Sequence, residues 1–242
     1  IILNNDFTVG PASILTGINQ PIYPLMQLGW SSRLKSQHFT FVEQVNTHFA
    51  NHFGIDPWLI TPYFSACDRL DFLSKTPHET LIAKADQLLA LTAAKYKEYG
   101  INQAPYLVIK ADQGTYGMAI MMIEHADELA SLNRKQRKNM ASLKGGRAVT
   151  QVILQEGIPS SECIDTQITA EPVIYHIGKN CVGGFYRANT NKGAQGKLNT
   201  PGMYFSPQSL NTSTLSARSY TYTVISRLAA LAAAHEIASL QG

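Results

Sequence analysis

Cysteine is scarce in this 242-residue chain, which holds only Cys67, Cys163 and Cys181. The number is odd, the three lie far apart and no CxxC pair occurs, so neither a disulfide scaffold nor a thiolate zinc site is indicated. This usage is typical of a reducing compartment, and we expect a cytoplasmic location. A chain of this length buries roughly 70% of its unfolded surface and needs no disulfides for stability.

Long apolar runs and a strong charge of one sign are also lacking. The most apolar segment, residues 220–240, is interrupted by Arg227, His235 and Glu236, so we expect no membrane-spanning helix. The net charge of +3 is too small to argue for nucleic acid. A basic run at residues 134–147 leaves RNA binding open, but it has no interleaved aromatic residues and is more typical of a solvated face.

The first residues have the pattern of the end of a buried strand. Ile1, Ile2 and Leu3 precede a polar turn, and no initiator Met is present, so we expect a preceding domain to be missing from this chain. Residues 5–37 are rich in Gly, Pro, Asn and Ser and form a long loop. A loop of this length is rarely idle, and it either contacts an amino-acid substrate through Asn5, Asp6 and Asn19 or serves as a structural turn.

Hydrophobic periodicity predicts helices over residues 38–53 and 78–99 and a closing helix over 216–240. Residues 125–147 are also helical in pattern and strongly basic. Short apolar segments bounded by turn residues predict five strands, at 106–109, 119–123, 152–154, 173–175 and 182–186. Strands at hairpin spacing mixed with helices, without regular βαβ alternation, indicate an α+β fold.

The segment Lys110–Met118 (KADQGTYGM) carries the clearest chemical signal, between two predicted strands. A lysine at a strand end beside a glycine-containing turn offers a charge and exposed backbone N–H groups, which suit a polyphosphate. Glycines permit positive φ and a close approach of the backbone to a ligand. The segment has neither the GxxxxGK[ST] nor the GxGxxG order, so an ordinary hairpin with an edge lysine remains the alternative.

The order of later segments resembles the ATP-grasp superfamily. A strand with a lysine is followed by a glycine-rich flap, a hinge strand with a carboxylate, a strand pair ending in arginine, and an Asn/Gly turn. More narrowly, the chain resembles the proteobacterial glutamate–cysteine ligases of the Thiobacillus ferrooxidans type along its whole length. The segments that carry this resemblance are LNNDFTVGPASILTGINQPIYP, KADQGTYGM, VILQEGI, EPVIYHIGKNCVGGFYR, LNTPGMYF and VISRLAALAAAHE.

This resemblance implies an α+β protein of ATP-grasp fold, with two lobes, a nucleotide cleft between antiparallel sheets and a missing N-terminal domain. We expect residues 1–75 to end that substrate domain and connect it onward, 76–157 to form the small lobe with the flap and hinge, and 158–242 to form the C-terminal lobe. The implied reaction uses ATP and Mg²⁺ to join the side-chain carboxylate of glutamate to the amine of cysteine through an acyl phosphate. We expect small-molecule partners only, and neither a membrane nor a nucleic acid.

The resemblance also implies roles for individual residues. Lys110 contacts the α/β-phosphates, and Arg187 holds the transferring phosphoryl group or the carboxylate. The nucleotide-binding residues are those of the flap and of the hinge strand: Asp112, Gly114, Thr115, Tyr116, Gly117, Gln155, Glu156 and Gly157. We expect the triphosphate to be held between the hairpin with Lys110 and the hinge strand with Glu156, in a cleft between these two elements.

The metal ligands are where the chain departs from the family pattern. ATP-grasp enzymes commonly end their site with Asp and then Glu-x-Asn, and this ending is missing here. Glu171, Asn189 and Asn199 are the candidate oxygen ligands for Mg²⁺. The missing ending leaves two other hypotheses open, namely another ATP-grasp carboxylate–amine ligase and a non-catalytic nucleotide- or RNA-binding module.

Overall fold

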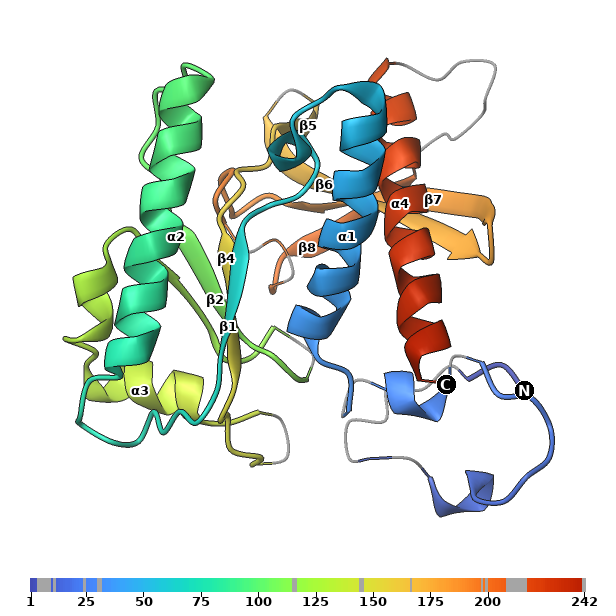
Figure 1. The fold of residues 1–242 in the computed structure, drawn as a ribbon, viewed down its shortest axis with the longest axis horizontal. Helices are drawn as coiled ribbons and strands as arrows, with labels where there is room; N and C mark the ends of the chain where they lie inside the picture. The colour runs from blue at the N-terminus through green and yellow to red at the C-terminus, as the bar shows by residue number, and fades with distance from the viewer. Residues whose placement is uncertain are drawn as a thin grey trace. The chain divides into compact units, whose positions relative to one another are not determined.

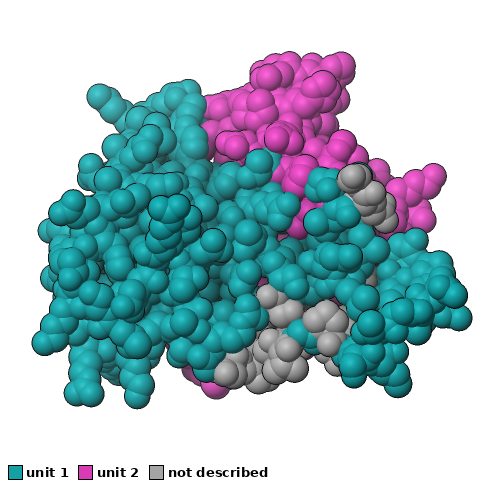
Figure 2. Space-filling model, turned by 60° about the horizontal axis from the view of Figure 1, so that its bottom comes forward, with its two compact units in different colours: residues 1–40, 62–157, 237–242 teal, residues 41–61, 158–236 magenta. Residues whose placement is uncertain are grey.

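The computed structural model of the chain describes all residues except 4–9, 11, 24, 30–31, 115–116, 144–145, 166, 197, 199, 208–216 and 241–242. The chain divides into two compact units (Figure 2). Unit 1 comprises residues 1–40, 62–157 and 237–242, and unit 2 comprises residues 41–61 and 158–236. Each unit contains one four-stranded antiparallel sheet, which confirms the predicted α+β class.

The sheet of unit 1 has the strand order β1-β4-β2-β3 (Figure 1). Its strands are β1 (Phe64–Cys67), β4 (Val152–Glu156), β2 (Leu107–Ala111) and β3 (Ile120–Ile123). Strands β2 and β3 form the predicted hairpin, and β2 also pairs with β4. The predicted hairpin and the hinge strand are therefore hydrogen-bonded neighbours in one sheet, and the cleft between them stays a prediction.

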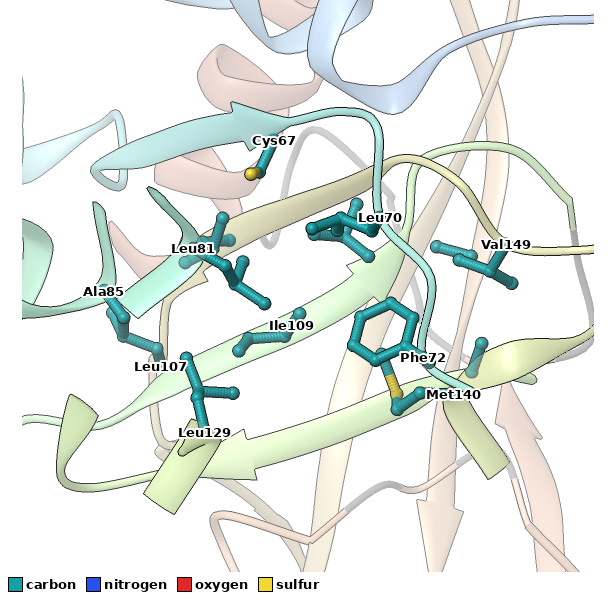
Figure 3. Close-up of a cluster of buried hydrophobic side chains, with 14 of the residues drawn as sticks. Cys67, Leu70, Phe72, Leu81, Ala85, Leu107, Ile109, Leu129, Met140 and Val149 are labelled. Atoms are coloured by element: carbon teal, nitrogen blue, oxygen red, sulfur yellow. The ribbon is translucent and has the colours of Figure 1, made fainter. Parts of the chain in front are cut away.

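One face of this sheet forms the hydrophobic core of unit 1 (Figure 3). Leu107 and Ile109 of β2 point into the core, where Leu81 of α2 (Glu79–Glu98) packs against them. Leu129 of the 3₁₀-helix η4 (Ala126–Leu129) and Met140 of α3 (Arg134–Ala141) complete it. Burial of these side chains is the main force that holds the sheet and these helices together.

The sheet of unit 2 has the order β5-β6-β7-β8. Its strands are β5 (Glu162–Ile164), β6 (Ile168–Ile177), β7 (Asn180–Asn189) and β8 (Met203–Pro207). Strands β6 and β7 form a long hairpin (Figure 1). Helix α4 (Ala217–Ser239) contacts one face of this sheet, where the Ser226 hydroxyl lies 2.9 Å from Nε2 of His176.

Helix α1 (Lys35–Phe53) and three short 3₁₀-helices lie in the first 60 residues. The 3₁₀-helices are η1 (Ser13–Leu15), η2 (Met26–Leu28) and η3 (Pro57–Leu59). The predicted long loop over residues 5–37 thus contains two short helical turns, and a parallel bridge joins Ile2 to Tyr23.

The predicted helices and strands are confirmed, with ends that differ by a few residues in most cases. Two kinds of difference appear. The short strands β1, β5 and β8 were not predicted, because β1 (FSAC) and β5 (ECI) mix apolar with polar residues and β8 (MYFSP) ends in proline. The basic segment 125–147 is not one helix, since Asn133 starts a new helix there by a reciprocal capping box with Gln136. None of the helices in the described ranges has the length and apolar character required to span a bilayer.

Gly157 gives a test of the packing at the end of β4. A Cβ atom at this position would lie 2.0 Å from Cε2 of Tyr106, whose side chain is only 5% exposed. Burial, with a further contribution from Tyr96, raises the pKa of Tyr106 to about 12. The ring therefore has to move out of a packed position to admit a methyl group.

We predict that Gly157→Ala lowers the free energy of unfolding by about 1–3 kcal/mol, the usual cost of overpacking. Urea denaturation measures this change. Gly183→Ala is the matched control, because no atom lies within 4 Å of its added Cβ and its effect should stay within about 0.5 kcal/mol. Equal stability of the two variants would contradict the packing at Tyr106.

Candidate functional site

Lys110 lies on the face of the unit 1 sheet that is opposite to the hydrophobic core. Side chains alternate along a strand, so Lys110 shares its face with Val108 of β2 and with Ile153 and Gln155 of β4, which pair with them. The Lys110 Nζ donates a hydrogen bond of 2.7 Å to Gln155 Oε1. Two of the residues predicted to bind nucleotide are thereby in direct contact, although 45 positions separate them.

Residues 112–114 and Gly117, which together we call the glycine turn, follow β2 directly. Gly114 has φ +86° and Gly117 has φ +61°. Residues other than glycine rarely adopt positive φ angles of this size. Leu143 packs under Gly114, and a Cβ there would lie 2.9 Å from Leu143 Cδ1. The turn therefore requires glycine at position 114 both for its backbone angle and for its packing. Thr115 and Tyr116 lie outside the described residues.

Asp112 is buried, with 2% of its surface exposed, and it binds the first turn of α1. Its Oδ1 accepts a hydrogen bond of 2.7 Å from the backbone N–H of Ser36, and its Oδ2 accepts one of 2.5 Å from the Ser36 hydroxyl. The backbone N–H of Lys35 donates to the Asp112 carbonyl at 3.0 Å. A carboxylate is favourable at a helix N-terminus, so these contacts give Asp112 a structural role at the start of α1, and its part in nucleotide binding stays a prediction.

Lys35 lies behind the glycine turn. Its Nζ donates to the carbonyls of Ala111, Asp112 and Gly114 at 2.8, 3.2 and 3.1 Å. Burial lowers the pKa of Lys35 from 10.5 to about 8; the charge of Asp112 raises it and that of Lys110 lowers it further. Sequence reasoning did not connect Lys35 with the turn, since the contact spans 76 or more positions and no local pattern marks it.

Arg147 contacts the same turn from a third segment of the chain. Its Nη2 donates a hydrogen bond of 2.8 Å to Oε1 of Gln113. Together with Lys35 and Lys110, it gives the surroundings of the turn three cationic residues. Such a group of cations beside backbone N–H groups is suited to bind an anionic ligand.

Glu156 points to the face of the sheet opposite to Lys110. It pairs with Leu107 in the register of β2 and β4, and its Oε2 accepts a hydrogen bond of 3.1 Å from the backbone N–H of Tyr63. Gly157, which follows it, donates from its backbone N–H to the Tyr106 carbonyl at 2.8 Å. Of the three predicted hinge residues, the side chain that lies with Lys110 is therefore that of Gln155.

In unit 2, Arg187 and Glu171 form an ion pair. They are directly opposite in the register of β6 and β7, and Glu171 Oε1 accepts from both Nε and Nη2 of Arg187 at 2.5 Å. The pair is partly exposed, with 30% of the Arg187 and 39% of the Glu171 side-chain surface accessible. Phe205 of β8 pairs with Arg187 on the same face. The structure thus joins a predicted catalytic residue to a predicted metal ligand.

Asn189, a second predicted metal ligand, is completely buried. Its Nδ2 lies 3.1–3.5 Å from oxygens of Leu198, Thr200 and Pro201, and its Oδ1 accepts from the Asn191 N–H at 2.9 Å. All groups around Nδ2 are acceptors, which fixes the orientation of the amide. These contacts hold the segment 198–201 and are not those of an accessible metal ligand.

Asn19 is exposed, and Asn5, Asp6 and Asn199 lie outside the described part of the chain. Within the ranges that the structure describes, no three His, Cys, Asp or Glu side chains gather in the geometry of a metal site.

Comparison with known proteins identifies a family and a related structure. A family model for GshA, glutamate–cysteine ligase, matches residues 1–237. A solved structure from Methylobacillus flagellatus KT, which bears the provisional name γ-glutamylcysteine synthetase, superimposes with a TM-score of 0.86 at 45% identity. The match covers 99% of this chain and 59% of that one, so the chain spans about three fifths of the length of this relative. None of the curated proteins matches the chain.

The contacts of Asn189 generate a second prediction. In Asn189→Asp, a carboxylate faces the oxygens that now accept from Nδ2, so we predict a loss of about 3 kcal/mol in the free energy of unfolding at pH 7. Burial raises the pKa of the new carboxyl group, so lowering the pH through that raised value protonates it and reduces the difference from the wild type. Urea denaturation at pH 7 and pH 5 measures both effects. The exposed Asn180→Asp variant is the control, and an Asn189→Asp protein as stable as this control would show that the amide does not hold the segment.

Proposed function

The chain belongs to the glutamate–cysteine ligase family, and from this membership we propose that it takes part in the ATP-dependent joining of glutamate and cysteine. In this reaction ATP phosphorylates the side-chain carboxylate of glutamate, and the amine of cysteine then attacks the acyl phosphate. The products are γ-glutamylcysteine, ADP and phosphate. The observation that carries the proposal is the position of Lys110 beside Gln155 and directly before the glycine turn.

We assign the binding of the ATP phosphates to Lys110 and the glycine turn. Phosphoryl transfer places negative charge on the phosphate oxygens, and positioned cations stabilise this charge. Lys110 supplies a cation at the end of β2, and Gln155 fixes its ammonium group by a hydrogen bond. The backbone of the turn supplies N–H groups and, folded over the phosphates, protects the acyl phosphate from water.

We assign the second charged group, Arg187 with Glu171, to the transferring phosphoryl or to the substrate carboxylate. A guanidinium group binds either of these in a bidentate way. Glu171 would bind Mg²⁺ through one oxygen. The ion pair with Arg187 involves Oε1, and an ionised carboxylate has a second oxygen that can act as a ligand. Asn189 does not fit, since it is buried and holds its own loop. The metal, when bound, neutralises charge on the phosphates.

The finer assignment of the fold is part of the same proposal. We propose that the two antiparallel sheets are those of an ATP-grasp fold, with a small lobe over residues 76–157 and a C-terminal lobe over residues 158–242. Residues 1–75 then belong to the end of a substrate domain and its connection. A cytoplasmic location, where ATP and free cysteine are available, agrees with this function.

A coupled assay for ADP release tests the proposed reaction. We predict that ADP forms only when glutamate, cysteine, ATP and Mg²⁺ are present together, and that γ-glutamylcysteine accumulates in equal amount. A panel of other carboxylates and amines separates this function from that of another ligase with the same fold. Faster turnover with a different pair of substrates, or no turnover by the full-length protein, would contradict the assignment.

Lys110→Met tests the assigned phosphate contact. Loss of a hydrogen bond to a charged group costs about 1.5–3 kcal/mol, so the affinity for ATP should fall by roughly 10- to 100-fold. Titration with a fluorescent ATP analogue measures it. Lys97→Met removes an exposed lysine on α2 and serves as the control. Unchanged affinity in Lys110→Met would refute the role of this lysine.

A further inference from the structure

We propose that Lys35 is a positioning residue that holds the glycine turn in its ligand-binding conformation. This inference rests on the proposed function, because it concerns the turn to which we have assigned the phosphates of ATP. It goes beyond that function by giving a role to a residue on α1 that neither the sequence motif nor the family match singles out.

The geometry separates positioning from direct ligand contact. An ammonium group has three N–H donors, and the three carbonyls of Ala111, Asp112 and Gly114 all lie within 3.2 Å of Lys35 Nζ. Each donor therefore has a backbone acceptor. Lys35 acts on a phosphate through the turn that it holds, whereas Lys110 has its ammonium group on the face of the sheet opposite to the hydrophobic core.

The three acceptors belong to the part of the backbone that has to keep an unusual shape. Ala111 ends β2, Asp112 is fixed to the start of α1 through Ser36, and Gly114 has φ +86°. Carbonyl oxygens that converge on one point repel one another, and a cation at that point removes the repulsion. The N–H of the first of these peptides, that of Asp112, donates to the Gln151 carbonyl at 3.0 Å, so Lys35 and Gln151 hold this peptide from opposite sides.

The ionisation of Lys35 supplies a readout that a purely structural residue lacks. Its pKa is lowered to about 8, mainly by burial; Asp112 on the turn opposes this shift and Lys110 on β2 adds to it. Below pH 8 the charged amine donates three hydrogen bonds. As the pH rises through about 8 the amine loses its charge and one donor, so the hold on the turn weakens and the affinity for ATP should fall.

The experiment compares the wild type with Lys35→Met, Lys35→Arg and the control Lys97→Met in the full chain. The first readout is hydrogen exchange of the amides in residues 111–119, measured by mass spectrometry without nucleotide. The second is the dissociation constant of a fluorescent ATP analogue at several values between pH 7 and pH 9. Circular dichroism establishes that each variant is folded, and Lys35→Arg keeps a charged donor if Lys35→Met does not fold.

The expected result is faster exchange in residues 111–119 of Lys35→Met alone. We also expect its ATP affinity to fall about tenfold at pH 7, which corresponds to a turn that is competent about one tenth of the time. Lys35→Arg should recover much of the ATP affinity. Because arginine stays charged, the ATP affinity of this variant should not fall above pH 8. Both Asp112 and Lys110 are present in all variants, so a difference between variants in the pH dependence of ATP affinity is due to Lys35.

Other results would overturn the inference. Exchange at the wild-type rate in Lys35→Met would show that the lysine does not hold the turn. Faster exchange with unchanged ATP affinity would show that the held conformation is not the one that binds. If the wild type itself does not bind ATP, the proposed function fails, and the exchange rates alone then decide whether Lys35 holds the turn.

Discussion

The hydrophobic face of the sheet in unit 1 is the constraint on which the candidate site depends. Leu107 and Ile109 of β2 are buried against the helices, and this burial fixes which residues of the strand point to the other face. A shift of the register by one residue would turn the ammonium of Lys110 into the core and Ile109 to the opposite face, at the cost of burying a charge. The contact between Lys110 and Gln155 is thus a consequence of how the apolar residues pack.

The sequence was sufficient to predict the local features and the class of the fold. Lys110 and the glycine turn were found because their chemistry lies within nine consecutive residues. Lys35 and the bond between Ser36 and Asp112 were not found, since partners 76 positions apart leave no periodic signal. The choice between Gln155 and Glu156 also required the structure, because only the strand register decides which of two adjacent side chains shares a face with Lys110.

The two charged groups differ in what they offer a ligand. Lys110 donates to the neutral amide of Gln155, and with Lys35 and Arg147 it places three cations around the glycine turn. Arg187 already contacts the carboxylate of Glu171, and an anion that binds it has to compete with this carboxylate. The group around Lys110 is therefore suited to bind a strongly anionic ligand. The pair of Arg187 and Glu171 is suited to rearrange when a ligand or a cation changes the local charge.

The position of Pro172 in β6 has a consequence for association between molecules. In the described part of the chain, β5 pairs with residues 168–170 of β6 only, so the rest of β6 is an outer strand on that side. Such a strand offers free N–H and C=O groups to another polypeptide, and Ile177 near its end is 71% exposed. Proline has no N–H to offer and interrupts a continuous ladder. At this position it makes the open border of the sheet a poor template for intermolecular β-sheet growth.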